Sequence, residues 1–127
     1  MWIAARDGYR NICELAIKKG GDPTYVDDYA DDISTLVIAY NNNHHDIADL
    51  LANNMSIDEL TKELCNHMQR QKHMNFLRFL LEHNANPDGK YNLMLIFFNE
   101  LKHTYVRPLH YAAYKNDVEM YNLLITY

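Results

Sequence analysis

Apolar residues recur at helical spacing in short segments along the whole chain. The longer segments lie at 12–17, 47–52, 76–81 and 118–125. In each of them the apolar side chains fall on one face of a helix, and in the last one Val118 and Tyr121 belong to that face. A shorter segment stands before each long one, such as 109–113, in which Leu109, Ala112 and Ala113 share a face. The pattern therefore predicts pairs of short helices.

Residues that end helices stand between the two predicted helices of a pair. Gly8, Asn43 and Asn116 occupy this turn position, where the backbone adopts a left-handed conformation that Gly and Asn tolerate. Lys72 stands there in the third pair, which departs most from the pattern. Pro108 suits the first position of a helix, and Ser34 is a good N-cap.

The segment 107–125 resembles a unit of the ankyrin-repeat family. That family's motif is a Thr-Pro-Leu-His-x-Ala-Ala helix, a Gly turn and a second helix with a Leu cluster. The residues in register are Pro108, Leu109, His110, Ala112 and Ala113, with Arg107 at the Thr place and Asn116 at the Gly place. The resemblance implies an all-α solenoid of stacked helix-turn-helix units joined by short β-turn fingers. It also implies that His110 bonds the backbone of its turn.

Four units in one domain account for most of the chain. Their expected bounds are 1–23, 24–57, 58–87 and 103–127, with an insertion at 88–102. The insertion contains a continuous apolar run, and such a run is rarely left exposed to solvent. We therefore expect an inserted helix whose apolar residues mostly pack inward. Those residues are Leu93, Leu95, Ile96, Phe97 and Leu101. Because neither end shows a polar capping unit, we expect a slice of a longer array.

Composition narrows the classes of function. The 127 residues are 48% hydrophobic, enough for one core, and the formal net charge is -5. A nucleic-acid binder usually carries a basic face, so nucleic acid is not an expected partner. The longest apolar run is too short to span a bilayer, so a membrane is not expected either. Cys13 and Cys65 lack a metal or disulfide spacing, so we expect both to be reduced and buried. This favours a cytoplasmic chain, in the host cytoplasm if it comes from an intracellular pathogen.

Histidine spacing argues against catalysis and metal binding. His44 and His45 are adjacent, so on a helix they point about 100° apart and cannot easily ligate one ion. Cys65 and His67 are too close along one helix for a thiolate–imidazole pair. No Gly-rich phosphate loop or nucleophile elbow occurs. We therefore expect no catalytic residue, no metal, no cofactor and no small-molecule substrate.

The most suggestive surface is the acidic segment 25–32, in which four Asp residues surround Tyr29. One interpretation is a solvated acidic loop. The other follows from the resemblance, because finger tips and outward positions of first helices line the family's concave binding face, and Tyr is an effective interface residue. The partner-binding residues carried over in this way are Asp28, Tyr29, Asp31, Asp32, Ile33, Asn41, Asn42, His103, Thr104, Tyr114 and Lys115.

The function that the resemblance implies is protein–protein recognition, as by a scaffold. We expect the partner protein to be basic where it meets the Asp side chains. The alternative is a regulatory or substrate-targeting segment of a larger enzyme, such as a pathogen effector. A third interpretation, a small metal-dependent hydrolase, is disfavoured by the histidine spacing.

Overall fold

The computed structural model describes residues 1–26, 33–70, 73–89, 91–97 and 100–127. Of these residues, the side chains of 69–70, 91–97 and 100–106 are not described. Eight helices and one two-stranded sheet form within the described part of the chain. The chain divides into two compact units, Met1–Met55 and Ser56–Tyr127.

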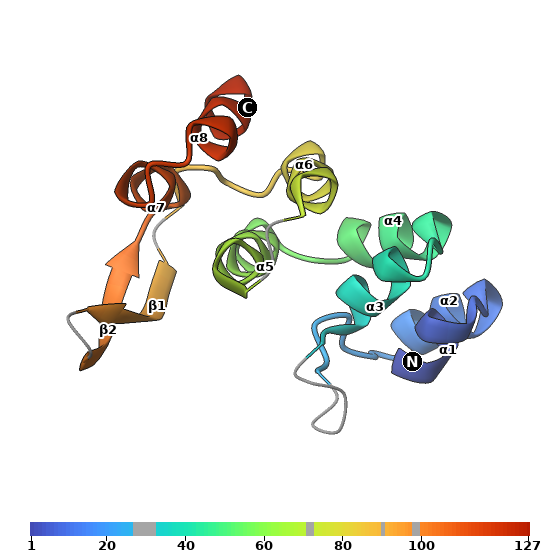
Figure 1. Cartoon of the computed structure of the whole chain (residues 1–127). Helices are drawn as coiled ribbons and strands as arrows, with labels where there is room; N and C mark the ends of the chain where they lie inside the picture. Colours follow the sequence, from blue (N-terminus) through green and yellow to red (C-terminus); the bar gives the residue numbers. More distant parts are fainter. Residues whose placement is uncertain (27–32, 71–72, 90, 98–99) are drawn as a thin grey trace. The chain divides into compact units, whose positions relative to one another are not determined.

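Two helix pairs make up the first unit (Figure 1, blue to green). They are α1 (Trp2–Asp7) with α2 (Arg10–Lys18), and α3 (Thr35–Asn41) with α4 (His45–Asn53). The two short helices contact each other, and so do the two longer ones, α2 and α4. The fully buried apolar side chains of this unit are Ala5, Cys13, Leu36, Ala39, Ile47, Ala48 and Leu51. Burial against the neighbouring pair supplies the core that a lone pair lacks.

The second unit contains two further helix pairs and a hairpin. Its elements are α5 (Ile57–Arg70), α6 (Met74–Glu82), β1 (Tyr91–Phe97), β2 (Glu100–Val106), α7 (Pro108–Tyr114) and α8 (Val118–Thr126). Here α5 contacts α7, and α6 contacts α8. The core includes Leu64, Phe76, Leu80, Ala112 and Leu124. Helix α5 begins with a capping box: the Ser56 amide donates to Glu59 Oε2 at 2.8 Å and the Glu59 amide donates to Ser56 Oγ at 3.1 Å.

The predicted left-handed turn residues are confirmed. Gly8, Asn43 and Asn116 have φ values of 85°, 63° and 53°. In all three turns the next residue's amide bonds a carbonyl five positions back: Tyr9 to Ala4, His44 to Ala39, and Asp117 to Ala112, at 2.8 to 3.0 Å. This is the Schellman closure of a helix. Lys72 lies outside the described residues.

The caps expected from the sequence are also present. Ser34 Oγ accepts a bond from the Val37 amide at 3.2 Å, and Pro108 is the first residue of α7. Ser34 also bridges to Val26 in an isolated antiparallel pair. The Thr35 amide and hydroxyl both donate to the Tyr25 carbonyl, at 2.9 and 3.0 Å. These bonds fasten the base of the segment 27–32, which itself lies outside the described residues.

The expected inserted helix at 88–102 is wrong. Residues 91–97 and 100–106 instead form an antiparallel hairpin in which Tyr91 pairs with Val106 and Phe97 with Glu100. A short apolar run does not distinguish a strand from a helix by periodicity. Here the run pairs with the segment that follows it, so the expected insertion and the start of the expected fourth unit form one hairpin. The predominantly helical class holds for the rest of the described chain.

The apolar faces of α7 and α8 also differ from expectation. Ala112 is fully buried, whereas Ala113 is exposed and Leu109 is half-buried. In α8 the buried stripe is Met120, Leu123 and Leu124, while Val118 is 65% exposed and Tyr121 39% exposed. Helix α8 therefore has two adjacent apolar stripes, which the sequence pattern did not distinguish. Only the stripe of Met120, Leu123 and Leu124 faces the core.

Replacing Ala112 should therefore destabilise the chain strongly, and the same change at Ala113 should not. Ala112→Gln puts a long polar side chain at a fully buried position, and we expect a loss of about 2–4 kcal/mol in the free energy of unfolding. Ala113→Gln, one position along the same helix, should stay within about 0.5 kcal/mol. Urea unfolding of both variants followed by circular dichroism measures this. Equal effects would contradict the assigned core face.

Candidate partner-binding surface

Four residues of the acidic segment that we predicted to bind a partner are not described by the structure. Asp28, Tyr29, Asp31 and Asp32 lie outside the described residues. Ile33, also predicted, is half-buried, and its carbonyl accepts a bond from Trp2 Nε1 at 3.0 Å. Its backbone therefore ties α1 to the approach of α3, which is a structural role.

Asn41 and Asn42 are exposed where α3 ends. The Asn42 side-chain amide donates to the Ile38 carbonyl at 2.9 Å, which holds it against its own helix. At the matching end of α1, Arg6 and Asp7 form an exposed ion pair with 2.8 Å between Nε and Oδ1. The hydrogen bond from Arg6 holds the pKa of the Asp7 carboxyl below its usual range. These helix ends present polar groups, several of them already engaged within the unit.

His44 has a structural role in the same unit. Its Nε2 lies 3.1 Å from the Arg6 carbonyl oxygen, so the ring joins the second helix pair to the first. The ring also packs on Gly8, where a Cβ would approach His44 Cε1 to 2.7 Å. Two demands thus fall on Gly8, a left-handed backbone and close contact with a ring. His45 is exposed, and its ring meets that of Tyr40 edge-on at 4.8 Å.

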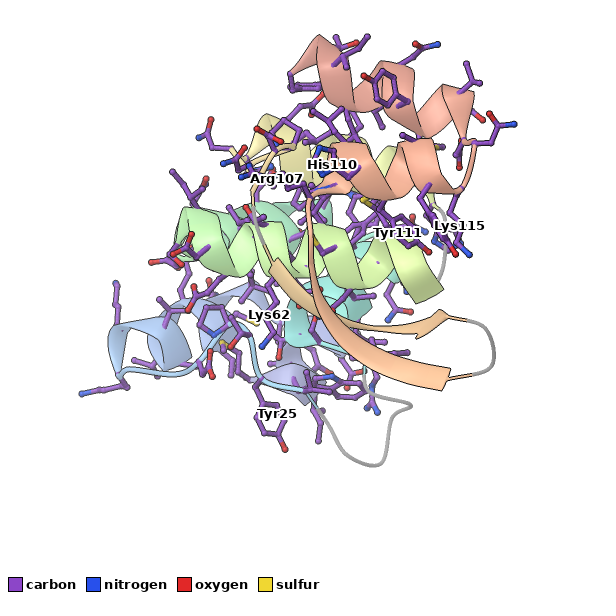
Figure 2. The ribbon with its side chains drawn as sticks, turned by 90° about the vertical axis from the view of Figure 1, so that its left-hand side faces the viewer. Tyr25, Lys62, Arg107, His110, Tyr111 and Lys115 are labelled. Atoms are coloured by element: carbon purple, nitrogen blue, oxygen red, sulfur yellow. The ribbon has the colours of Figure 1, made fainter. Side chains whose placement is uncertain are left out.

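In the second unit, the clearest candidate is a group of five side chains on and beside α7. We call it the α7 surface, and it comprises Arg107, His110, Tyr111, Tyr114 and Lys115. Figure 2 shows Arg107 and His110 at the start of α7 and Lys115 at its far end. Of these residues, Tyr114 and Lys115 were predicted to bind a partner. Tyr114 is 61% exposed.

Lys115 lies over two tyrosine rings. Its Nζ is 5.9 Å from the ring centroid of Tyr111 and 5.6 Å from that of Tyr114. Such cation–π contacts orient an ammonium group on an aromatic face. Burial raises the pKa of the Tyr111 hydroxyl, which stays protonated and able to donate at neutral pH. Tyr111, Tyr114 and Lys115 thus form one pre-arranged polar and aromatic cluster.

Arg107 anchors the hairpin instead of presenting a free charge. Its Nη1 donates to the Asp88 carbonyl at 2.7 Å and lies 3.3 Å from Asp88 Oδ2. The expectation that His110 bonds its turn is not met: among the described residues its exposed ring makes no hydrogen bond. The turn at 86–89 is held from other elements: the Asn86 amide donates to Thr61 Oγ1 at 2.9 Å, and Gly89 packs against the Thr61 methyl group.

Two predicted residues lie on the hairpin itself. His103 pairs with Met94 and Thr104 with Leu93 in the antiparallel register. Their side chains are outside the described part of the structure. The register places both residues in the strand that leads directly into α7, so the chain brings them into the same unit as Tyr114 and Lys115.

Sequence reasoning missed a shallow groove at the outer side of α7 and α8. Its volume is ≈ 290 Å³, and its lining residues are Ala112, Ala113, Asn116, Asp117, Val118 and Tyr121. The signal was available in the sequence: Val118, Tyr121 and Ile125 form a second apolar stripe beside the buried one. All three are substantially exposed.

The two thiols that could act as nucleophiles are shielded from solvent. Cys13 and Cys65 are free thiols and buried, as predicted. Burial raises the pKa of Cys65 to about 12, so its nucleophilic thiolate is scarce at neutral pH. Within the described residues, no three His, Cys, Asp or Glu side chains gather in a way that could hold a metal ion. No described helix is long and apolar enough to cross a membrane.

His67 is a buried imidazole beside the turn between α5 and α6. It is 7% exposed, and its Nε2 has no hydrogen-bond partner within the described structure. Its ring packs edge-on against Phe76 at 4.5 Å and lies 5.5 Å from the ring of His73. Burial, with a smaller contribution from His73, lowers its pKa to about 4.

The burial of His67 predicts a loss of stability in mild acid. A base whose pKa falls on folding stabilises the fold fully above its ordinary pKa of 6.5, and this contribution is lost as the pH falls toward 4. We expect the free energy of unfolding to drop by roughly 2 kcal/mol between pH 7.5 and 4.5 from this group. Urea unfolding of wild type and His67→Leu at both pH values isolates it. The same acid loss in both proteins would show that His67 is not responsible.

Comparisons with known proteins add no relative to this description. The chain matches no protein-family model, no curated protein and no solved structure.

Proposed function

We propose that this chain is an ankyrin-repeat stack that binds a partner protein through its fingers and the exposed sides of its short helices. The observation that carries the proposal is the repeated unit. In three helix pairs a left-handed Gly or Asn follows a short helix, the next amide bonds the carbonyl of a buried Ala in that helix, and a longer helix begins. Proteins built from such units stack them into an extended surface for recognition.

The stacking inside each unit supports the proposal. In the first unit α1 packs on α3 and α2 on α4, and in the second α5 packs on α7 and α6 on α8. First helices thus meet first helices, and second helices meet second helices. We expect such an arrangement to present the segments before the first helices, and the helix ends beside them, to another protein.

The hairpin supplies the finger in the second unit. It directly precedes α7, the place in the repeat that the segment 27–32 holds before α3. In Figure 1 the hairpin runs from the start of α7 away from α8. Its base is fixed by the Arg107–Asp88 and Thr61–Asn86 bonds. A fixed finger base lowers the entropy lost when the finger tip binds.

For the first unit we propose contact with a basic region of the partner. The acidic segment around Tyr29 would steer the encounter electrostatically, because like-signed carboxylates attract a basic surface over about a Debye length, ~8–10 Å at physiological salt. Tyr29 would add the buried anchor of the contact.

Reversing two of these charges tests the first-unit contact. A partner is first isolated with the wild-type chain as bait, and its affinity for Asp31→Lys/Asp32→Lys is then measured at low and physiological salt. We expect weaker binding, mainly through a slower association rate, and an unchanged melting temperature.

A charge-matched control separates a local contact from a change in net charge. Asp49→Lys/Asp58→Lys alters two exposed carboxylates outside the finger by the same amount. It should leave the association rate close to that of wild type. If both double variants weaken binding equally, or if neither weakens it, a contact at Asp31 and Asp32 is contradicted.

A further inference from the structure

The charges of this acidic chain are unevenly divided. Residues 89–116 hold four Lys or Arg side chains and a single carboxylate, Glu100, a formal charge of +3. The other residues hold 8 Lys or Arg against 16 Asp or Glu, a formal charge of -8. The cationic segment 89–116 contains the hairpin and α7, and one carboxylate flanks it at each end, Asp88 and Asp117. The finger of the second unit therefore differs in sign from the acidic finger of the first.

We infer that the α7 surface binds an acidic peptide segment of the partner, with Lys115 pairing a carboxylate and Tyr111 and Tyr114 packing against the peptide. The inference rests on the proposed function, because it takes the same finger region as a partner surface. It assigns that surface a ligand of opposite charge to the one expected at Asp31 and Asp32.

Lys115 is the cation best placed for this contact. No ion pair among the described residues includes it, whereas Arg107 is already bound to Asp88. The tyrosine rings hold its ammonium group without using its N–H donors, so these remain available to a carboxylate. Pre-orientation by two rings also reduces the side-chain entropy that pairing would otherwise cost.

The tyrosines favour a peptide over a small anion. Tyr114 is 61% exposed beside Lys115, and a ring of that size contributes to affinity only when a ligand covers it. Side chains and backbone next to a carboxylate can do so, whereas free phosphate cannot. The negative charge on the rest of the chain disfavours a nucleic acid, whose backbone would extend past the cationic segment.

Nuclear magnetic resonance on the ¹⁵N-labelled whole chain tests the inference even when binding is weak. The probe is an eight-residue peptide of alternating Glu and Ser, with a Gln/Ser peptide as its matched partner. We expect the Glu peptide to shift the amide signals of residues 111–115, and the Gln peptide to have little effect. The shifts should decrease as salt is raised.

Three variants locate the contact on Lys115. Lys115→Glu should weaken binding of the Glu peptide roughly five- to tenfold, and Lys115→Arg should retain it. Lys18→Glu makes the same charge change on exposed α2 and should have no effect. Unaltered spectra elsewhere show that each variant is folded. Equal shifts by the Glu and Gln peptides, or unchanged binding by Lys115→Glu, would overturn the inference.

Two further results separate this inference from the proposed function. If the Glu peptide does not bind but an isolated partner is lost on Asp31→Lys/Asp32→Lys, the inference fails and partner binding stands. If the peptide binds at residues 111–115 but no protein partner is found, the α7 surface binds acidic peptides as inferred and the proposed partner binding fails. Tighter binding of a single-stranded oligonucleotide to the same residues would overturn the acidic peptide in favour of nucleic acid.

Discussion

The architecture depends on one backbone event, the left-handed residue that ends each short helix. At Gly8, Asn43 and Asn116 the chain reverses within a few residues and closes the helix with a bond to the carbonyl of Ala4, Ala39 or Ala112. Those alanines are buried, and a larger side chain would separate the helices that meet there. The two pairs within each unit can then stack, because a reversal brings the two helices of a pair together with their apolar stripes on the same side.

Features settled by a few neighbouring residues could be predicted from the sequence. Ser34 caps α3, Pro108 opens α7 and Asn116 ends it, because each residue's own conformational preference decides the matter. The hairpin could not be predicted in this way. Its first strand reads equally well as a helix until Tyr91 is known to pair with Val106. The exposed stripe of α8 was missed for a similar reason, since only packing shows which apolar face is covered.

The region that departs most from the repeat has a compensating structural role. Helix α5 is longer than the other first helices. It begins with the Ser56–Glu59 capping box, whose Ser-x-x-Glu spacing is typical of a helix start. Near the start of this helix stands Thr61, whose hydroxyl accepts a bond from the Asn86 amide and whose methyl group meets Gly89. The irregular third pair thus supports the base of the hairpin. Sequence spacing alone showed only that a repeat was irregular.

The long cationic side chains fall into two groups, and the difference bears on which of them can recognise a partner. Arg10 spans from α2 to the Asp46 carbonyl at 3.0 Å, and Arg107 spans from α7 to Asp88, so both spend their donors within their own unit. Lys115 instead lies over two aromatic rings, and no ion pair within the described part of the chain includes it. Arginine suits the first task, since its rigid fork satisfies several acceptors at once, whereas a lysine ammonium remains adaptable to an incoming carboxylate. The bond of Arg107 to Asp88 therefore fixes one end of the α7 surface, and Lys115 is the cation of that surface on which the proposed peptide contact rests.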